Sequence, residues 1–460
     1  MTNANQMYLK VCDDAKIFIS PPEMLGYFTK EGQKFEKNSL NKTACRMLEM
    51  ARNQIPLDKI IDDYLTIINK KNDQNFEKLF TFFKHLEELG IIEFVTKPVD
   101  NTGKIRGHFD KFYPKVLTFE LVEKCNLLCS HCYNRSHAEN SLIMEWRKLP
   151  PLLEKLKNNG LEIVQFTGGE PMLHPDFNEI LAFSCHTFNS VFILTNGTLI
   201  TVDFIQKFKK YTDKIKFSIS LDNYKPEIHE KVRHSKGCFD LTTTGIKKLR
   251  NENFYVRIGM TFDDNTIDDI AETFNFSIKE LNANHFTCNP VLPYGRSYNC
   301  WHAADESILS KISVELEKIA LSPHKNRFMK TPKSDENPMN CGAGYKTFTV
   351  CADGTLKPCV LFPKSFCKIG NIFSDNTDLL FSYDNLNFFI NIDISKGKPE
   401  CQNCNFNPKF CEGCLLNSLT LAHKKQDCAW RRKNIEKITA ACLPDYSYNF
   451  DIVEVSNKSD

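Results

Sequence analysis

The sequence lacks several features that mark specialised classes of protein. No apolar run is long enough to span a bilayer, and the polar residues 1–11 contain no signal-peptide core. Lysine plus arginine number 59 against 57 aspartate plus glutamate, so the net charge of +2 offers no basic stripe for nucleic acid. Internal repeats and low-complexity tracts are absent. We therefore expect a globular cytoplasmic protein that is not embedded in a membrane.

Cysteine, in contrast, is abundant, with 19 copies in 460 residues. In a reducing compartment this favours metal ligation over disulfides. Ten cysteines form two spaced groups, namely Cys125-x3-Cys129-x2-Cys132 and then Cys341, Cys359, Cys401, Cys404, Cys411, Cys414 and Cys428. Three thiolates can hold a four-iron cluster with one iron left open, and seven suffice for one full cluster and most of another. The sequence thus predicts several iron–sulfur clusters and redox chemistry.

The first expected domain covers residues 1–97. Short strands over 9–12 and 16–20, helices ending near 48 and covering 57–65 and 76–89, and a strand over 91–95 predict a winged-helix-like shape. Residues 1–100 hold 14 basic and 15 acidic side chains, and such a neutral module is a poor DNA binder. Residues 98–111, with Pro98, Gly103 and Gly107, are expected to form a linker.

Strand and helix signals alternate in the second expected domain, residues 112–320. Strands are predicted over 116–122, 163–166, 191–195, 215–220, 255–262 and 285–291, with helices between them, such as 149–159 and 203–211. This α/β pattern predicts a parallel sheet, and six strands suggest a partial (β/α)6 TIM-like barrel. The third expected domain, residues 335–460, holds the second cysteine group, and residues 348–350 and 355–357 should form a hairpin.

Motifs follow the predicted barrel strands in a fixed order. The first cysteine group comes after the first strand, Thr167-Gly168-Gly169-Glu170-Pro171 ends the second, Thr195-Asn196-Gly197 the third, and Ser220 the fourth, with Arg233 further on. This pattern resembles the radical S-adenosylmethionine enzymes.

The resemblance implies a site for each motif residue. Cys125, Cys129 and Cys132 would be the catalytic cysteines that hold three irons of a [4Fe-4S] cluster, whose fourth iron binds S-adenosylmethionine. The residues implied to contact S-adenosylmethionine are His131, Gly168, Gly169, Glu170, Asn196, Ser220 and Arg233. Glu170 and its two glycines would bind the methionine amino group, and Ser220 and Arg233 the ribose and carboxylate region.

The second cysteine group is similar to the SPASM-type extension of radical enzymes that act on peptides. By that resemblance Cys401, Cys404, Cys411 and Cys428 would hold one auxiliary cluster, and Cys341, Cys359 and Cys414 another whose fourth ligand stays open. Cys351 and Cys367 are nearby. The spacing alone also suits a zinc ribbon.

Residues 340–346, 357–364 and 370–373 resemble the sactipeptide synthases, which join a cysteine sulfur to the α-carbon of another residue. The resemblance implies an N-terminal domain that captures the leader of a precursor peptide, and an external reductant of the flavodoxin or ferredoxin type. Radical enzymes that form β- or γ-carbon thioethers, carbon–carbon crosslinks or formylglycine are alternatives. A noncatalytic, zinc-containing peptide-binding protein is an alternative of another class.

Overall fold

The structure is a computed structural model of the whole chain. It describes residues 6–21, 26–30, 39–292, 295–297, 306–329, 342–362, 364, 369–392, 415–416 and 429–442. The chain forms two compact units. Unit 1 comprises Met1–Lys115, Leu152–Leu161 and Thr377–Leu386, and unit 2 comprises Val116–Pro151, Glu162–Asn376 and Asn387–Asp460.

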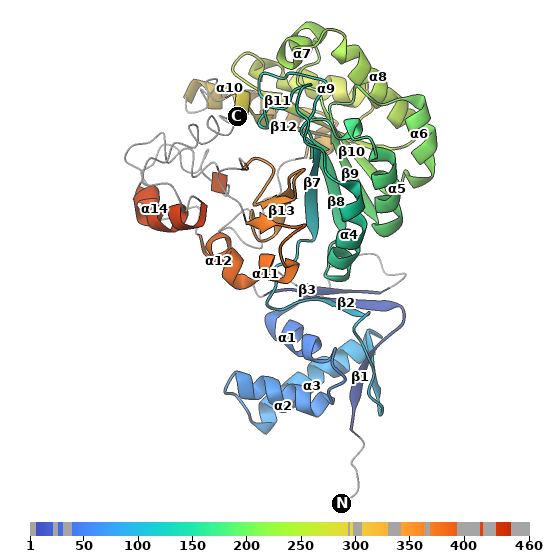
Figure 1. Cartoon of the computed structure of the whole chain (residues 1–460), viewed down its shortest axis with the longest axis vertical. Helices are drawn as coiled ribbons and strands as arrows, with labels where there is room; N and C mark the ends of the chain where they lie inside the picture. The colour runs from blue at the N-terminus through green and yellow to red at the C-terminus, as the bar shows by residue number, and fades with distance from the viewer. Residues whose placement is uncertain are drawn as a thin grey trace, which may run out of the picture. The chain divides into compact units, whose positions relative to one another are not determined.

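Unit 1 combines three helices with small sheets (Figure 1). Its strands are β1 (Tyr8–Val11), β2 (Ala15–Ile19), β3 (Gly26–Lys30), β4 (Ser39–Leu40), β5 (Ile92–Val95) and β6 (Ile105–Gly107). β1 pairs antiparallel with β5, and the other four form a sheet in the order β4-β3-β2-β6. The helices are α1 (Lys42–Met50), α2 (Leu57–Ile67) and α3 (Asp73–Glu88).

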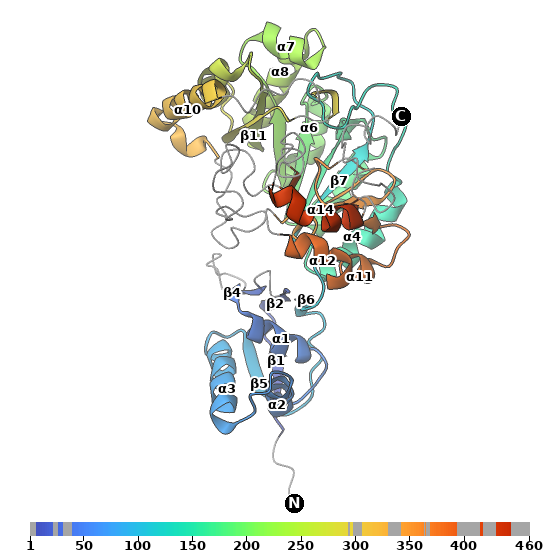
Figure 2. The ribbon, with the colours of Figure 1, turned by 90° about the vertical axis from the view of Figure 1, so that its left-hand side faces the viewer.

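The helix starts of unit 1 follow from capping residues. The side chain of Asn41 accepts a hydrogen bond from the Ala44 N–H at the start of α1. Asn72 does the same for Asn75 at the start of α3, so this helix begins three residues before the predicted start at 76. α3 packs against α2 and β5, as Figure 2 shows.

The segment 98–111, expected to be a linker, contributes to the core of unit 1. Its strand β6 pairs in parallel with β2. The buried Asn101 side chain donates to the carbonyls of Leu9 and Ala51 and accepts from the Val11 N–H. This strand was not predicted because the segment contains glycines and a proline, and three residues are too few to show a periodic pattern.

Unit 2 is built on a nine-stranded sheet in the order β12-β11-β10-β9-β8-β7-β13-β14-β15. The strands are β7 (Val116–Val122), β8 (Ile163–Gly168), β9 (Ser190–Thr195), β10 (Ile215–Ser220), β11 (Tyr255–Phe262), β12 (His285–Pro290), β13 (Thr347–Val350), β14 (Thr355–Lys357) and β15 (Gly370–Asn371). β7 to β12 are all parallel neighbours, which confirms the predicted parallel α/β sheet. β13 and β14 form the predicted antiparallel hairpin.

Helices connect the barrel strands, and α5, α6 and α8 lie along one side of them (Figure 1). The helices that follow residue 115 in the chain are α4 (Leu149–Asn158), α5 (Phe177–Thr187), α6 (Val202–Phe208), α7 (Pro226–Arg233), α8 (Cys238–Asn251), α9 (Ile270–Lys279), α10 (Glu306–Leu321), α11 (Thr377–Leu380), α12 (Tyr383–Asn391) and α14 (Ala429–Cys442). α4 and α12 span the boundary between the units, and α11 belongs to unit 1. Within the described ranges, no helix combines the length and apolarity needed to cross a membrane.

The hydrophobic core of unit 2 lies along the parallel strands. Buried aromatic side chains come from four of the six parallel strands, with Phe119 on β7, Phe166 on β8, Phe217 on β10 and Phe286 on β12. Along β11 buried and half-buried residues alternate, as expected for a strand that packs one face against helices. This core fixes the carboxyl ends of the strands, where the motif residues lie.

One pairing in unit 2 was not expected from the sequence. β13 pairs in parallel with β7, from Thr347 opposite Val116 to Val350 opposite Phe119. The hairpin of the third expected domain therefore continues the sheet of the barrel. A four-residue strand that is buried over most of its length shows too little alternation to predict which strand it pairs with.

Candidate functional site

A loop that leaves β7 carries the first cysteine group, and its side chains alternate between two environments. Cys125, Leu127 and Cys129 are buried and pack together with Cys238, and Cys132 packs against them. The residues between them, Lys124, Asn126, Leu128 and Ser130, are exposed. The loop therefore turns its thiols inward as one group and presents the other face outward.

The thiols fit an iron–sulfur cluster in number, chemistry and surroundings. Soft thiolate ligands select such clusters, and hydrogen bonds to the sulfurs tune them. The Leu127 N–H donates to Cys125 Sγ and Arg233 Nη1 donates to Cys129 Sγ, both at 3.4 Å. Burial raises the pKa of Cys125 to about 12, so cluster assembly must displace its proton.

Arg296 holds the cysteine loop from the segment after β12. Its Nε donates to the carbonyl of Cys129 at 2.7 Å, and its two terminal nitrogens donate to the carbonyl of Ser136 at 3.0 Å. The preceding Gly295 has φ +59°, and a Cβ there would lie 2.2 Å from the Cys132 carbonyl oxygen. Arg296 was not predicted, because its only signal in the sequence is a Gly-Arg pair after the sixth strand.

Gly168 and Gly169 end β8 in close contact with backbone. A Cβ on Gly168, at φ +133°, would lie 2.2 Å from the carbonyl oxygen of Val122, and one on Gly169 would lie 2.2 Å from that of Lys124. The Gly169 N–H donates to Val122 and the Glu170 N–H to Lys124. Both glycines are thus required for the β8 turn to pack on the start of the cysteine loop.

Glu170 is fully buried at the centre of a hydrogen-bond network. Its carboxylate accepts from the Thr195 hydroxyl at 2.8 Å, the Asn196 N–H at 2.9 Å and the Met172 N–H at 3.1 Å. Burial raises its pKa to about 7, against the lowering effect of these donors. The Asn196 side chain donates to Asn126 in the cysteine loop at 2.9 Å, which links three motifs.

Arg233 and Asp222 form a buried ion pair beside the thiols. Arg233 Nε lies 2.7 Å from Asp222 Oδ2, and the side chains are 8% and 0% exposed. Burial would raise the pKa of Asp222, but Arg233 and two histidines hold it below its ordinary value. His131 lies 3.8 Å from Asp222 Oδ2, and burial lowers its pKa. His229 accepts from the Asp222 N–H, and burial lowers its pKa to about 4.

The remaining predicted residues of the first site lie at the same end of the sheet. Ser220, half-buried, is the last residue of β10, and Thr195 and Asn196 end and follow β9. Arg257 on β11 donates to Ser218 and not to the thiol group. The structure thus gathers the three cysteines and the turns after β8, β9 and β10 at the carboxyl edge of one parallel sheet, where such folds place ligands.

The second cysteine group lies mostly outside the described residues. Cys341, Cys401, Cys404, Cys411, Cys414 and Cys428, as well as Cys367, fall in ranges that the structure does not describe. Cys359 is described and half-buried after β14. Cys351 is buried, and burial together with the charge of Glu120 raises its pKa.

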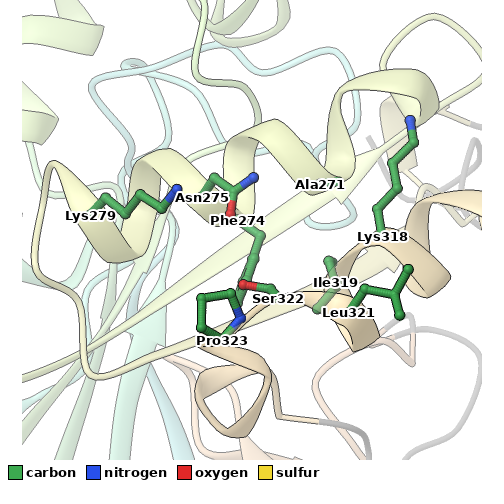
Figure 3. A pocket seen from close by; sticks show the side chains of 9 residues that line it. All are labelled: Ala271, Phe274, Asn275, Lys279, Lys318, Ile319, Leu321, Ser322 and Pro323. Atoms are coloured by element: carbon green, nitrogen blue, oxygen red, sulfur yellow. The ribbon is translucent and has the colours of Figure 1, made fainter.

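A hollow of about 250 Å³ lies between α9 and α10 (Figure 3). Its lining residues are Ala271, Phe274, Asn275, Lys279, Lys318, Ile319, Leu321, Ser322 and Pro323. None of them belongs to the predicted site. The lining mixes apolar side chains with two lysines, one of which, Lys318, pairs with Glu315.

Comparison with known proteins assigns the middle of the chain. Residues 119–277 match the model of the Radical SAM superfamily. The chain is 29% identical over 405 residues to the antilisterial bacteriocin subtilosin biosynthesis protein AlbA of Bacillus subtilis, and the match covers 86% of this chain and 89% of AlbA.

Two crystal structures of Streptococcus suis SuiB share the fold. SuiB bound to the precursor peptide SuiA has a TM-score of 0.58 and 16% identity, covering 90% of this chain and 97% of SuiB. SuiB bound to S-adenosylmethionine has a TM-score of 0.57 and 17% identity, covering 90% and 96%. The recognition and the fold class predicted from the motifs are confirmed, and so are S-adenosylmethionine and the [4Fe-4S] cluster as cofactors. Residues 119–277 are a radical SAM domain, and the chain is a radical SAM enzyme.

Proposed function

We propose that this enzyme modifies a ribosomally made precursor peptide by joining cysteine sulfurs to the α-carbons of other residues. The observation that carries the proposal is the reach of the similarity to the subtilosin biosynthesis protein. It covers 86% of this chain, whereas the radical SAM match ends at residue 277. The similarity therefore extends to parts of the chain outside the radical SAM domain.

The described residues support a division of labour at the first site. Cys125, Cys129 and Cys132 would hold the cluster, with Arg233 donating to one of its sulfurs and Arg296 fixing the loop. Burial raises the pKa of the Glu170 carboxyl group to about 7. A positive charge on the methionine amino group of the cofactor would favour the ionised form of this side chain. When bound, S-adenosylmethionine and the reduced cluster supply a 5′-deoxyadenosyl radical that abstracts a hydrogen atom.

The proposed leader-binding surface lies in unit 1. The rings of Phe76 and Phe80 on α3 stack with centroids 6.5 Å apart, and Phe80 stacks on Phe94 of β5 at 5.9 Å. All three rings are half-buried, and Lys84 lies 4.9 Å from the Phe80 ring. A row of half-buried rings next to a short strand suits an extended peptide that adds to the strand and inserts apolar side chains.

The second cysteine group would hold two auxiliary iron–sulfur clusters, with Cys359 as the described member. Formation of a thioether bond removes two hydrogen atoms from the peptide. One leaves the carbon with its electron by radical abstraction, and the other leaves the thiol as a proton. The electron left over needs an acceptor, and the auxiliary clusters would take it. The first cluster needs a one-electron reductant, for which we propose a flavodoxin or ferredoxin.

An anaerobic assay tests the radical chemistry. The protein is reconstituted with iron and sulfide and given S-adenosylmethionine and dithionite, and 5′-deoxyadenosine is measured by chromatography. We expect nucleoside from the wild type and none from Cys125→Ala/Cys129→Ala/Cys132→Ala, because a cubane without its three thiolates is lost. Equal nucleoside from both proteins would overturn the assignment of these cysteines.

A peptide assay tests the thioether. The substrate is a cysteine-bearing precursor peptide, sought among short reading frames beside the gene, with a deuterium label on the α-carbon of each candidate acceptor residue. Mass spectrometry should show a loss of deuterium and of one free thiol per crosslink. Retention of the α-deuterium in the crosslinked product would indicate a β- or γ-carbon linkage instead.

A further inference from the structure

The parallel sheet of unit 2 has two unlike faces. One is apolar and covered by helices (Figure 1), since the rings of Phe217 on β10 and Phe204 on α6 pack together, as do those of Phe286 on β12 and Phe274 on α9. Along β10 and β11 these fully buried positions alternate with half-buried ones, which therefore point to the opposite face. We call this second face the polar face, and its residues on the two strands are Lys216, Ser218, Ser220, Tyr255, Arg257, Gly259 and Thr261.

Two cations occupy adjacent rows of the polar face. Lys216 stands opposite Phe192 of β9, and its Nζ lies 5.4 Å from the centre of that ring. In the next row Arg257 stands between Ser218 and His285. Its Nε and Nη2 donate to the Ser218 hydroxyl at 3.2 and 3.0 Å, which fixes the plane of the guanidinium group. Long side chains at such diagonal positions on neighbouring strands can reach one common group.

Neither cation forms an ion pair with any residue that the structure describes, and the Nη1 atom of Arg257 has no hydrogen-bond partner there. Burial lowers the pKa of Arg257, and no carboxylate opposes this effect. In Arg233, by contrast, Asp222 outweighs burial and raises the pKa. Burial lowers the pKa of His285 too, and the charges of Arg327 and Arg257 lower it further. The positive charge of the polar face is therefore unbalanced within the described residues.

The carboxylates around the polar face are paired or lie elsewhere. Glu120 of β7 points to this face, but it pairs with Lys357 at 2.9 Å. Asp213 is exposed before the start of β10, and its charge acts on Cys185 of α5, on the helix-covered side. Asp263 lies beyond the carboxyl end of β11, where it accepts from two residues of the following turn. A carboxylate for the two cations must then come from a bound molecule.

The position of the two cations relates them to the chemistry of the site. Ser220, a predicted contact of S-adenosylmethionine, follows Ser218 by two residues on the same face. A strand rises about 3.3 Å per residue, so the row of Arg257 lies about 7 Å from that of Ser220. A group held by Arg257 would thus be a neighbour of the substrate atom that loses its hydrogen. In a peptide crosslinked at internal residues, such a neighbour is a side chain and not the chain end.

We infer that Arg257 and Lys216 bind the side-chain carboxylate of an aspartate or glutamate in the substrate peptide, next to the residue that loses its hydrogen atom. This inference rests on the proposed function and names a class of substrate for it, namely peptides that are acidic close to the crosslinked residue. The guanidinium group offers forked donors that match a carboxylate, and Ser218 holds it in one orientation. Lys216 adds a second positive charge.

The test is a double-mutant cycle between enzyme and peptide. The probes are the cysteine-bearing precursor peptide with a fluorescent label, and the same peptide with each aspartate and glutamate after the leader changed to asparagine or glutamine. Binding to the reconstituted enzyme with S-adenosylmethionine is followed by fluorescence anisotropy. We expect the neutral peptide to bind the wild type about tenfold or more weakly than the natural one. Arg257→Gln should lose a similar factor for the natural peptide and bind the two peptides within about twofold of each other.

Further variants make the test specific. Arg257→Lys keeps the charge and should recover part of the lost affinity, and Lys216→Met should show a smaller loss than Arg257→Gln. Arg250→Gln is the matched control, because Arg250 is also half-buried but donates to backbone carbonyls from α8. It should leave both peptide affinities unchanged. Each variant should keep its affinity for S-adenosylmethionine and its nucleoside formation with dithionite, which shows that the fold and the first cluster are intact.

The outcomes separate this inference from the proposed function. Failure of the wild type to crosslink any such peptide would reject the proposed function itself. Normal crosslinking with equal binding of the natural and neutral peptides, or of a peptide that has no acidic residue after its leader, would reject only the carboxylate site. A loss of affinity caused instead by amidation of the peptide carboxyl terminus would assign the contact to the chain end and overturn the inference. Weaker binding of S-adenosylmethionine to Arg257→Gln would assign Arg257 to the cofactor and overturn it as well.

Discussion

Unit 2 contains two buried ion pairs of similar geometry in different surroundings. Arg233 and Asp222 are 2.7 Å apart with side chains 8% and 0% exposed, and Lys357 and Glu120 are 2.9 Å apart at 3% and 4%. Arg233 also donates to the Cys129 sulfur, whereas Lys357 donates to the carbonyl of Val360. The first pair borders the proposed ligands of the first cluster, and the second joins β14 to β7.

The contrast shows that burial of charge does not identify a functional site. Burial would lower the pKa of Lys357, yet Glu120 holds it above its ordinary value, and the same balance raises the pKa of Arg233 beside Asp222. Each pair has a thiol beside it. Arg233 donates to Cys129, which is a predicted ligand of the first cluster, whereas the Cys351 thiol that hydrogen-bonds Glu120 is matched to no cluster. We therefore assign chemistry to the first pair and structural support to the second.

The largest expected effect is on stability at the structural pair. Lys357→Met leaves the Glu120 carboxylate buried without its cation, which should cost about 3–5 kcal/mol in the free energy of unfolding. The melting temperature of the protein, followed by circular dichroism, measures the loss.

A double variant provides the control for this effect. Glu120→Leu/Lys357→Met replaces both charges by apolar groups and should recover most of the loss, because neither charge is then left unpaired. A double variant as unstable as the single one would mean that the pair itself, and not an orphaned charge, stabilises the fold.

The functional pair should respond in activity. Arg233→Lys keeps the charge, but a single ammonium group cannot reach Asp222 and the Cys129 sulfur with the geometry of a guanidinium group. We expect nucleoside formation to fall by about 10- to 100-fold, together with an altered electron paramagnetic resonance signal of the reduced first cluster.

Arg250→Lys is the matched control. Arg250 donates to the carbonyls of Asn282 and Phe254, away from the thiols, so its replacement should leave the spectrum and the turnover unchanged. If Arg233→Lys also left both unchanged, the two ion pairs would not differ in the way we describe.

The smallest expected effect concerns a carboxylate that has no cation at all. Burial raises the pKa of Glu162 to about 7, and its Oε1 has no hydrogen-bond partner in the described structure. Because its folded pKa lies above the unfolded one, its contribution to stability is present below about pH 4.5 and is lost as the pH rises to about 7. Glu162→Gln should therefore stabilise the protein by about 1–2 kcal/mol at pH 8 and by little at pH 4.5, measured by urea unfolding. An equal gain at both pH values would refute the ionisation argument.

The sequence predicted regular structure well where long patterns exist. β7, β10 and β11 have the predicted bounds, because alternating or continuous apolar runs bounded by turns define a strand without tertiary information. β3, β4 and β6 were not predicted, since neither an alternating pattern nor a hairpin turn marks these short strands in the sequence. The start of α3 was missed because a polar first turn carries no apolar stripe.

The candidate site was predictable in its residue types and not in its contacts. Cysteine spacing and the Gly168-Gly169-Glu170 turn are local signals. The two glycines are needed because a Cβ at either position would clash with the carbonyl oxygen of Val122 or Lys124, more than forty residues earlier in the chain. The Arg296 contacts with Cys129 and Ser136 span 160 residues or more, and no local pattern encodes such pairs.

The parallel pairing of β13 with β7 has a practical consequence. A shortened chain that ends after the six parallel strands would leave β7 with a row of free backbone donors and acceptors along one side. Such an open border recruits strands from other molecules, so the isolated barrel should self-associate and precipitate. The loop that carries Cys125, Cys129 and Cys132 leaves this same strand, so the damage would reach the cluster that the shortened chain was meant to isolate.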